Sequence, residues 1–394
     1  MSDFREQADR LQIGAVDVLP AGSLVERLRE GRPLRVKLGI DPTAPDIHLG
    51  HVVVLEKLRQ FQAAGHTAVL IIGDYTARVG DPSGRSSLRP NLDAGEIDAN
   101  ARTFTEQAFK VLDSGATEVR YNSEWLEMPS GELFGIAKRF TVARLLERDD
   151  FQKRMAAAQP ISALEMLYPI LQGYDSVAVE ADLELGATEQ RFNLLFARDV
   201  QEAYGKEPQS VMTLPILPGT EGVRKMSKSL DNYVGVTEAP AEIFGKLMSV
   251  PDAALPVYWT LLLGQELDRA RHPVEAKREL ARRICDRFAG EGSGAEAERR
   301  FDEVHVKGAI PDDVRVFQVQ QSPDEEIHLP VLLSGLFEIS TSEARRLLKQ
   351  GAVKLDGETV DPTTIDLPGN ELSGRVIQAG KRKFARLAFT GGAT

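Results

Sequence analysis

Two histidines separated by a Leu-Gly pair stand in the stretch Asp41–His51, which reads DPTAPDIHLGH. Three kinds of chemistry fit this spacing. Asp46 could cap a helix whose first turn merely contains His48 and His51. The two imidazoles could instead ligate a metal ion. Finally, the helix start could offer its free N–H groups and its dipole to a phosphate chain, with Gly50 leaving room for a flat base or ribose.

A metal site is disfavoured by the rest of the composition. The six histidines are scattered, and Cys285 is the only cysteine, so neither an internal disulfide nor a multi-thiolate zinc site can form. The apolar, helical surroundings of Cys285 (ELARRICDRFAG) favour a buried thiol over a nucleophile. We therefore expect no protein-bound metal, while the capping and nucleotide interpretations stay about equal on this stretch alone.

A second motif, KMSKS at Lys225–Ser229, favours the nucleotide interpretation. On its loop, Lys225 and Lys228 can close over a triphosphate and neutralise charge in a transition state. Taken alone, such a Lys/Ser pentapeptide is usually a solvated loop. An HxGH turn followed by KMSKS, however, resembles the class I aminoacyl-tRNA synthetases, whose two ATP-binding signatures these are. In that family HxGH is not a metal site.

A polar stripe on one predicted helix is the next feature. Ser162 and Glu165 form a capping box at its start. Tyr168, Gln172 and Asp175 follow at i, i+4 and i+7, so they share one face of the helix. Without other information, such a stripe is usually exposed to solvent.

Three short segments narrow the resemblance. Together, YPILQGYD, GDPSGR (80–85) and GATEQRFN (186–193) look like the tyrosyl-tRNA synthetases, over about residues 37–233 and again in the tail. GDPSGR lacks the G-x-x-x-x-G-K-[ST] spacing of a P-loop, so a P-loop is excluded. We do not find the pocket pattern of the tryptophanyl enzymes, which are the nearest relatives of that family.

The resemblance implies a role for each matching residue. The catalytic residues that it implies are Thr43, His48, His51, Arg85, Lys225 and Lys228. The residues that would line ATP or the adenylate are Gly39, Asp41, Pro42, Leu49, Gly50, Gly186, Glu189, Met226, Ser227 and Ser229. The residues that would bind tyrosine are Lys37, Thr76, Asp81, Tyr168, Gln172, Asp175 and Gln190.

Within the implied tyrosine pocket, Asp81, Tyr168 and Gln172 would hold the substrate ammonium, and Gln190 would orient its carboxylate. Asp175 would accept the phenolic hydrogen bond. A phenylalanine would leave that carboxylate unpaired, which is the kind of rejection for which a tyrosyl enzyme is the standard example.

Two positions depart from the family's pattern. Lys37 stands where the family often has a tyrosine that also binds the substrate hydroxyl, and Glu189 stands where it often has an aspartate. We therefore expect Asp175, rather than Lys37, to read the hydroxyl.

The elements that must position these residues alternate between strand and helix. Residues 34–41 and 66–74 are β-rich, and Val54, Leu58 and Phe61 between them have helical spacing. Such a βαβ unit implies a parallel sheet, and nucleotides bind at the carboxyl ends of its strands. The HxGH stretch follows such an end. The sequence thus predicts an α/β, Rossmann-type fold.

The chain is long enough for two to three domains. We predict a catalytic domain at 1–235 with a helical insertion at about 117–150, an α-helical domain at 236–316, a polar linker at 317–330, and a small α+β domain at 331–394. The Pro-bounded, acidic composition of 317–330 is typical of a linker.

The tail differs in charge from the rest of the chain. Although the whole chain carries −11, residues 331–394 hold nine Lys and Arg against seven Asp and Glu. A capped helix, a strand, an Asp356–Gly357 turn and another strand resemble the S4 RNA-binding module. The resemblance implies tRNA contacts, although such charge runs are often solvated faces. The basic residues concerned are Arg345, Arg346, Lys349, Lys381, Arg382, Lys383 and Arg386.

Taken together, the resemblance implies a homodimeric, cytoplasmic ligase that joins L-tyrosine to tRNA-Tyr. ATP would be a substrate and would carry Mg²⁺, and the 117–150 insertion would form the dimer interface. Apolar runs are strand-sized and the N-terminus is charged, so no membrane partner or signal peptide is expected. Three different functions stay open: tryptophanyl specificity, a small-molecule ligase with the same HxGH fold, and a synthetase-derived RNA-binding protein without catalysis.

Overall fold

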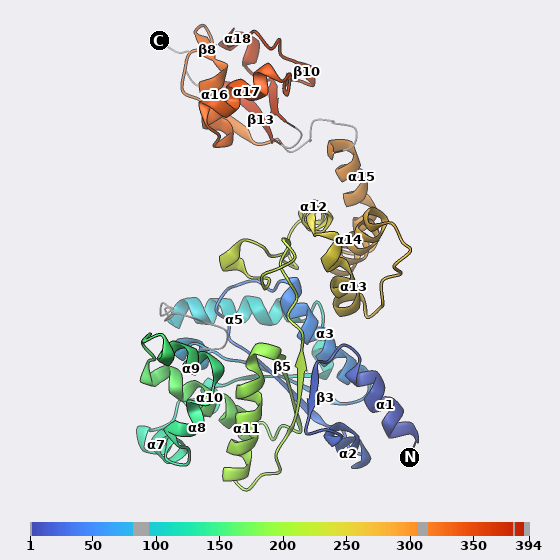
Figure 1. Ribbon diagram of the computed structural model, residues 1–394, viewed down its shortest axis with the longest axis vertical. Helices are drawn as coiled ribbons and strands as arrows, with labels where there is room; N and C mark the ends of the chain where they lie inside the picture. Colours follow the sequence, from blue (N-terminus) through green and yellow to red (C-terminus); the bar gives the residue numbers. More distant parts are fainter. Residues whose placement is uncertain (1, 82–93, 306–313, 381–382, 390–394) are drawn as a thin grey trace. The chain divides into compact units, whose positions relative to one another are not determined.

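Two compact units make up the chain, Met1–Ala289 and Gly290–Thr394. The computed structural model describes residues 2–81, 94–305, 314–380 and 383–389. Three of the predicted site residues lie outside these described residues, namely Arg85, Lys381 and Arg382. Figure 1 shows the ribbon with many of the elements labelled.

A six-stranded sheet organises the first unit. In spatial order its strands are β1 (Asp17–Leu19), β6 (Ser210–Leu214), β5 (Leu183–Ala187), β2 (Arg35–Ile40), β3 (Thr67–Ile72) and β4 (Thr117–Tyr121). All neighbours pair in parallel except β1, which is antiparallel to β6. The predicted α/β class with a parallel sheet is therefore confirmed. The chain order reverses between β2 and β5, and ligands bind such sheets beside this reversal.

Both faces of the central strands are covered. Every residue of β6 is buried, and in β3 only the first residue is not. Six helices of this part are α1 (Ser2–Gln12), α2 (Ser23–Arg29), α3 (Leu49–Ala63), α5 (Ala94–Ala108), α10 (Ala163–Ala178) and α11 (Arg191–Ala203). Helices α10 and α11 pack side by side (Figure 1). The short helix α4 (Thr76–Val79) contacts α10.

Four short helices follow β4, where the sequence predicts a helical insertion. They are α6 (Ser123–Leu126), α7 (Ser130–Ala137), α8 (Val142–Leu145) and α9 (Asp149–Ala156). The start of that insertion differs from the prediction, because residues 117–121 form β4 and pair in parallel with β3. All five residues of β4 are only partly buried. A half-covered edge strand tolerates the polar sequence TEVRY, which explains why the strand signal was weak.

Three further helices complete the first unit, namely α12 (Pro240–Ser249), α13 (Leu255–Leu263) and α14 (Pro273–Ala289). They lie within the segment 236–316, for which the sequence predicts a separate helical domain. In the structure they share one compact unit with the sheet, because α13 packs against α3 and Arg287 of α14 forms an ion pair with Glu56 of α3.

The second unit begins with α15 (Ser293–His305) and contains a five-stranded sheet. In spatial order its strands are β10 (Glu358–Thr359), β9 (Val353–Leu355), β12 (Val376–Ala379), β13 (Lys383–Phe389) and β7 (Val316–Val319). A separate pair joins β11 (Asp366–Pro368) to β8 (Glu326–His328). The helices beside them are α16 (Leu329–Phe337), α17 (Thr341–Lys349) and α18 (Gly369–Leu372).

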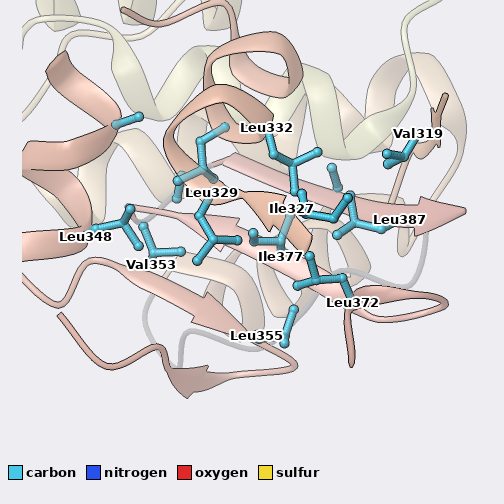
Figure 2. Close-up of a cluster of buried hydrophobic side chains, with 14 residues drawn as sticks. Val319, Ile327, Leu329, Leu332, Leu348, Val353, Leu355, Leu372, Ile377 and Leu387 are labelled. Atoms are coloured by element: carbon cyan, nitrogen blue, oxygen red, sulfur yellow. The ribbon is translucent and has the colours of Figure 1, made fainter. Parts of the chain in front are cut away.

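An apolar cluster forms the core of this unit, with Leu329, Leu348, Ile377 and Leu387 among its members (Figure 2). The predicted linker 317–330 contributes to the core, since it contains most of β7 and all of β8. The register Phe317↔Leu387 makes β7 a parallel edge strand. The apolar residues of FQV alternate with a polar one, as in a strand, but the acidic residues that follow made this strand pattern hard to recognise.

The predicted turn at Asp356–Gly357 is confirmed. Strands β9 and β10 pair antiparallel with Leu355 opposite Glu358, so the turn contains two residues. Both have positive φ, +50° for Asp356 and +89° for Gly357, as a hairpin turn that follows the strand twist requires. No helix in the described part of the chain is long and apolar enough to span a membrane.

The contact between α10 and α11 generates a stability prediction. A Cβ at Gly173 of α10 would lie 2.5 Å from Val200 Cγ2 and 3.2 Å from Ala197 Cα of α11. Gly173→Ala should therefore push the helices apart and destabilise the first unit by about 1–3 kcal/mol. Gly245→Ala in α12, where a Cβ meets nothing within 4 Å, should instead be neutral or stabilising. Midpoints of thermal unfolding test both, and equal shifts would contradict the prediction.

Candidate functional site

A cavity of about 260 Å³ opens where the chain order reverses, at the carboxyl ends of β2 and β5. Ten of the predicted site residues line it: Gly39, Asp41, Thr43, Gly50, His51, Asp81, Tyr168, Glu189, Gln190 and Lys225. A larger cavity of about 900 Å³, lined by α1, α3 and α13, holds none of the predicted residues. Its buried ammonium, Lys57, is already bound by the carbonyl oxygens of Leu11 and Ile13 and by Gln60. The smaller cavity is therefore the candidate site.

The two histidines of HxGH hold the start of α3 together. His48 is the N-cap residue, and its Nδ1 accepts a hydrogen bond from the N–H of Gly50 at 3.1 Å. His51 Nδ1 accepts from the N–H of His48 at 3.3 Å, and the two rings stack with centroids 3.9 Å apart. The interpretation of Asp46 as the cap is wrong; its carboxylate forms an ion pair with Lys228 instead.

Both imidazoles are neutral at pH 7. Burial lowers the pKa of His48 to about 2, with smaller contributions from His51 and Lys228. Burial, and then Lys228, lowers the pKa of His51 to about 4. Because Nδ1 of each ring accepts a hydrogen bond, the ring proton stands on Nε2. The helix start thus carries two neutral N–H donors in addition to its backbone N–H groups.

Gly50 is needed for the geometry of these rings. A Cβ at this position would lie 2.9 Å from both Cε1 and Nδ1 of His48, and would prevent the cap from forming. Glycine is therefore required here by the histidine ring, in addition to the space for a base or ribose that the sequence suggested. Gly39, by contrast, has nothing within 4 Å of a Cβ, so the backbone of β2 is open to close approach there.

The backbone joins the two motifs directly. The N–H of Leu49 donates to the carbonyl oxygen of Val234 at 2.9 Å, and His48 forms an isolated antiparallel bridge with Gly235. The segment that follows KMSKS therefore lies against the start of α3. Contacts between residues almost two hundred positions apart cannot be read from either motif.

Asn232 fixes the KMSKS loop and was missed by the sequence reasoning. Its Oδ1 accepts from the N–H of Ser227 at 2.8 Å, and its Nδ2 donates to the carbonyl oxygen of Lys225 at 3.0 Å. The hydroxyl oxygens of Ser227 and Ser229 are 2.9 Å apart, and Met226 is buried. A buried amide just after a polar loop is a signal only once its burial is known.

Both lysines of the loop are paired with carboxylates. Lys225 Nζ lies 3.1 Å from both carboxylate oxygens of Glu189, and Lys228 pairs with Asp46. Glu189 and Lys225 also line the cavity. A dianionic or more highly charged ligand would compete with these carboxylates for the two ammonium groups.

A second group of polar side chains surrounds Asp41 at the end of β2. Thr76 Oγ1 donates to Asp41 Oδ1 at 2.7 Å, and the Tyr168 hydroxyl donates to Oδ2 at 2.9 Å. Burial, and then Asp41, raises the pKa of Tyr168 well above its usual value, so the hydroxyl stays neutral. Because that hydroxyl donates its proton to Asp41, its lone pairs remain available to accept from a cation.

Gln190 and Asp81 lie on the other side of the cavity. Gln190 Oε1 accepts from the N–H of Ala187 at 3.0 Å, so its amide nitrogen is directed toward Asp81 Oδ2, 3.5 Å away. Asn193 Nδ2 lies 3.4 Å from Asp81 Oδ1. Gly186 provides the space that this arrangement needs, because a Cβ there would lie 2.9 Å from Gln190 Oε1.

Some predicted residues do not line the cavity. Pro42 and Leu49 are buried, and the carbonyl oxygen of Pro42 accepts from Asn100 at 3.2 Å. Four other predicted residues are buried and do not line it either, namely Lys37, Thr76, Gln172 and Asp175.

Asp175 is linked to Asp41 through hydrogen bonds. Asn122 Nδ2 donates to Thr76 Oγ1 at 2.9 Å and lies 3.4 Å from Asp175 Oδ2, while Thr76 donates to Asp41. Trp125 Nε1 donates to Asp175 Oδ1 at 2.8 Å. Burial raises the pKa of Asp175 to about 7, against the lowering effects of Lys37, Trp125 and Asn122.

Asn122 and Trp125 were also missed by the sequence reasoning. They follow the carboxyl end of β4, which is where a parallel sheet presents its functional side chains. The signal was present in NSEWL, but it was hidden because residues 117–121 were assigned to the helical insertion.

Lys37 has no proton left for a ligand. It is completely buried, and its ammonium lies 3.0 Å from the carbonyl oxygen of Gln172, 2.8 Å from Ser176 Oγ and 2.9 Å from Glu184 Oε1. An ammonium has three N–H donors, and these three acceptors occupy them. The geometry thus argues against the predicted contact between Lys37 and tyrosine.

In the second unit, the predicted basic residues that the structure describes are exposed. Arg345, Arg346 and Lys349 lie on α17, whose first turn is capped by Ser340. Lys383 and Arg386 lie on β13, where they donate to the carbonyl oxygens of Phe337 and Gly374.

Comparison with known proteins identifies two families along the chain. The family described as tRNA synthetases class I (W and Y) matches residues 29–302, and the S4 domain matches residues 329–369. The two matches leave out residues 1–28, 303–328 and 370–394.

Curated relatives match over nearly their full length. A tyrosine–tRNA ligase of Moorella thermoacetica is 48% identical over 97% of this chain and 96% of its own. The tyrosine–tRNA ligase of Oleidesulfovibrio alaskensis is 47% identical over 98% of this chain and 99% of its own. Among solved structures, the tyrosyl-tRNA synthetase of Archaeoglobus fulgidus, complexed with L-tyrosine, superposes with a TM-score of 0.60. It is 20% identical and covers 75% of this chain and 98% of its own, so it supports the fold alone.

The contact between Trp125 and Asp175 generates a spectroscopic prediction. The chain has two tryptophans, and Nε1 of the other, Trp259, has no hydrogen-bond partner among the described residues. In a Trp259→Phe background, the emission of Trp125 should titrate with a midpoint near pH 7, because the indole N–H is bonded to a carboxyl that ionises there. Adding Asp175→Asn should abolish this titration. A midpoint that survives Asp175→Asn would contradict the assignment.

Proposed function

The chain belongs to the class I tRNA synthetases of the tryptophan and tyrosine group, and from this premise we infer that it is a tyrosine–tRNA ligase. It activates L-tyrosine with ATP to tyrosyl-adenylate and pyrophosphate, and then transfers tyrosine to the 3′ end of tRNA-Tyr. The observation that carries this inference is identity of almost half the residues to tyrosine–tRNA ligases over nearly the whole chain. The same observation disfavours tryptophanyl specificity.

Two further functions that the sequence left open are disfavoured by particular residues. A small-molecule ligase would not need the S4 domain that matches residues 329–369. An RNA-binding protein without catalysis would not need to keep His48, His51 and Lys228 together at the start of α3. That Lys228 lies close enough to affect both histidines supports an intact nucleotide site.

The chemistry requires no nucleophilic side chain. A carboxylate oxygen of tyrosine attacks the α-phosphorus of ATP, the new C–O–P bond forms, and the bond to the β-phosphate oxygen breaks to release pyrophosphate. The terminal hydroxyl of tRNA then attacks the activated carbonyl carbon and displaces AMP. The protein's part is to position the reactants and stabilise the charge that moves to the leaving group.

For ATP, we propose that the start of α3 and the KMSKS loop bind the triphosphate. The neutral Nε2–H donors of His48 and His51 and the positive end of the helix would meet it from one side. Lys225 and Lys228 would exchange their bonds to Glu189 and Asp46 for phosphate oxygens. Thr43, and Arg85 in the part of the chain not described, would assist them.

The remaining adenylate contacts belong to the same proposal. The open backbone at Gly39 and the cavity-lining Gly186–Gln190 turn would lie along the ribose, with Asp41 and Glu189 as acceptors. Mg²⁺ would arrive with the triphosphate, whose oxygens it prefers as ligands.

For tyrosine, we propose that three acceptors hold the ammonium: the Tyr168 hydroxyl, Asp81 and the side-chain oxygen of Gln172. The amide of Gln190 would donate to the substrate carboxylate. Asp175, held by Trp125, would accept the phenolic hydrogen bond, and Thr76 would support it through Asn122. Lys37 would support this pocket from behind rather than touch the substrate.

A homodimer is part of the proposal. The segment between β4 and α10 exposes large apolar side chains, with Phe134 67%, Val142 59% and Met155 54% exposed. Exposed apolar groups gathered on one segment favour an interface with a second copy of the chain. A cytoplasmic location likewise remains a prediction, which is supported by the bacterial tyrosine–tRNA ligases to which the chain is similar.

For tRNA, we propose that the exposed basic residues of the second unit contact the phosphate backbone. Arg345, Arg346 and Lys349 stand on one helix that the S4 match includes. Lys383 and Arg386, together with Lys381 and Arg382, would extend this surface.

Tyrosine-dependent exchange of pyrophosphate into ATP, measured across the twenty amino acids without tRNA, tests the activation step. Exchange should occur with tyrosine only, and Lys228→Ala should lower its rate by about 10²–10³-fold, because a charge that stabilises the leaving group is lost. Lys206→Ala, which removes an exposed lysine paired with Glu180, should leave the rate unchanged. Exchange with tryptophan would overturn the specificity, and no exchange from folded protein would overturn the ligase assignment.

Loss of the basic face of α17 tests the tRNA contacts. The triple change Arg345→Ala, Arg346→Ala and Lys349→Ala should raise KM for tRNA-Tyr by at least about 10-fold and lower the salt dependence of binding, because fewer counterions are released. Pyrophosphate exchange, which needs no tRNA, should not change. Ser342→Ala on the same helix serves as control. An unchanged KM for tRNA would contradict the proposal.

A further inference from the structure

One amide oxygen on α10 is buried without a partner among the described residues. Gln172 Oε1 has no hydrogen-bond partner among the residues that the structure describes, although Gln172 is 9% exposed. An unsatisfied buried amide oxygen costs about 1–3 kcal/mol. Gln172 lies one helical turn beyond Tyr168, whose hydroxyl also keeps free lone pairs. Two acceptors on one face of α10 are therefore available to a cation.

The orientation of the Gln172 amide is dictated by Glu184. Gln172 Nε2 donates to Glu184 Oε1 at 3.0 Å, and Glu184 is completely buried. An ionised carboxylate can only accept hydrogen bonds, so the amide must turn its NH₂ group toward Glu184 and its oxygen away. The assignment of oxygen and nitrogen in this amide thus follows from the network.

Lys37 makes a buried carboxylate at this position possible. Residues 37 and 184 are direct partners in the parallel register of β2 and β5, and their charged groups lie 2.9 Å apart. Ser176 accepts from Lys37 at 2.8 Å and donates to Glu184 at 3.3 Å, while Gln209 also donates to Glu184. A buried charge without such partners would be strongly destabilising.

We propose that Lys37 and Glu184 are positioning residues for the substrate ammonium: their buried ion pair fixes the Gln172 amide so that its oxygen, and not its NH₂ group, faces the amino group of tyrosine. The proposal rests on the tyrosine–tRNA ligase function inferred above. Neither residue touches the substrate. Lys37 holds the carboxylate and the backbone carbonyl of Gln172, and the carboxylate in turn holds the side-chain amide.

This role explains the lysine at position 37. A tyrosine there could donate to the hydroxyl of the substrate, whereas the three protons of Lys37 are used within the protein. Recognition of the phenol is then left to Asp175, and the buried pair serves the opposite end of the amino acid.

Glu184→Gln is the decisive change. A glutamine at 184 can donate as well as accept, so it can bond to Gln172 Oε1 and let the amide turn its NH₂ group toward the ammonium. Because this variant leaves the Lys37 charge unpaired, Lys37→Met combined with Glu184→Gln removes both charges together and is expected to fold. Glu165→Gln, which alters another buried ion pair at the start of α10, serves as matched control.

The readout is a comparison of two ligands. L-tyrosine and 3-(4-hydroxyphenyl)propionate share the phenol and the carboxylate and differ in the ammonium. In the full-length protein, both variants should weaken binding of L-tyrosine by about 10- to 100-fold, as expected for loss of a hydrogen bond to a charged group. Binding of the propionate should change by less than about 3-fold. In Glu165→Gln, the two ligands should keep their wild-type ratio.

Each outcome decides a different point. If the variants weakened binding of both ligands equally, the ion pair would merely support the fold of the pocket. If the double variant bound tyrosine as the wild type does, Gln172 would need no orientation by the pair. Either result overturns the inference. If the wild-type protein itself bound no L-tyrosine, the ligase function would fail instead. Tyramine, which keeps the ammonium and lacks the carboxylate, should follow L-tyrosine.

Discussion

The parallel pairing of β2 with β5 is the constraint on which the site depends. It places the chain reversal of the sheet at this point, so that the ends of both strands open into one cavity. The same register sets Lys37 opposite Glu184 below α10. A shift of either strand by one residue would turn its side chain to the other face of the sheet and separate Lys37 from Glu184. The candidate cavity and the buried pair that we propose to support the amino-acid side therefore depend on the same strand pairing.

Charges and polar groups in this region are compensated locally. Asp41 accepts from Thr76 and Tyr168, Asp175 accepts from Trp125, and Glu184 is bound by several donors. The two histidines remain neutral because burial disfavours their charged forms. In such surroundings each remaining acceptor gains importance, since few other groups can satisfy an incoming ammonium. The side-chain oxygen of Gln172, which has no hydrogen-bond partner among the described residues, is the acceptor that we propose for the substrate ammonium.

The two signature motifs form a single structural unit. His48 caps α3 with its own ring, and the backbone after the KMSKS loop pairs with that residue. The loop lysines meanwhile bind carboxylates that border the site. A triphosphate that bound these lysines, as we propose, would couple its binding to the position of the loop, because phosphates and carboxylates would compete for the same ammonium groups.

The sequence by itself determined the α/β fold, the family and most of the residues around the cavity, because fixed motifs and the strand–helix alternation are local signals. It could not determine that Asp46 pairs with Lys228 and leaves the cap to His48, or that Asn122 and Trp125 support Asp175. It also assigned β4 to an insertion and β7 to a linker, since the apolar pattern of edge strands is weak. The role of Lys37 was decided by tertiary structure alone: whether an ammonium faces a ligand or a carboxylate depends on which strand pairs beside it, and that pairing joins residues far apart in the chain.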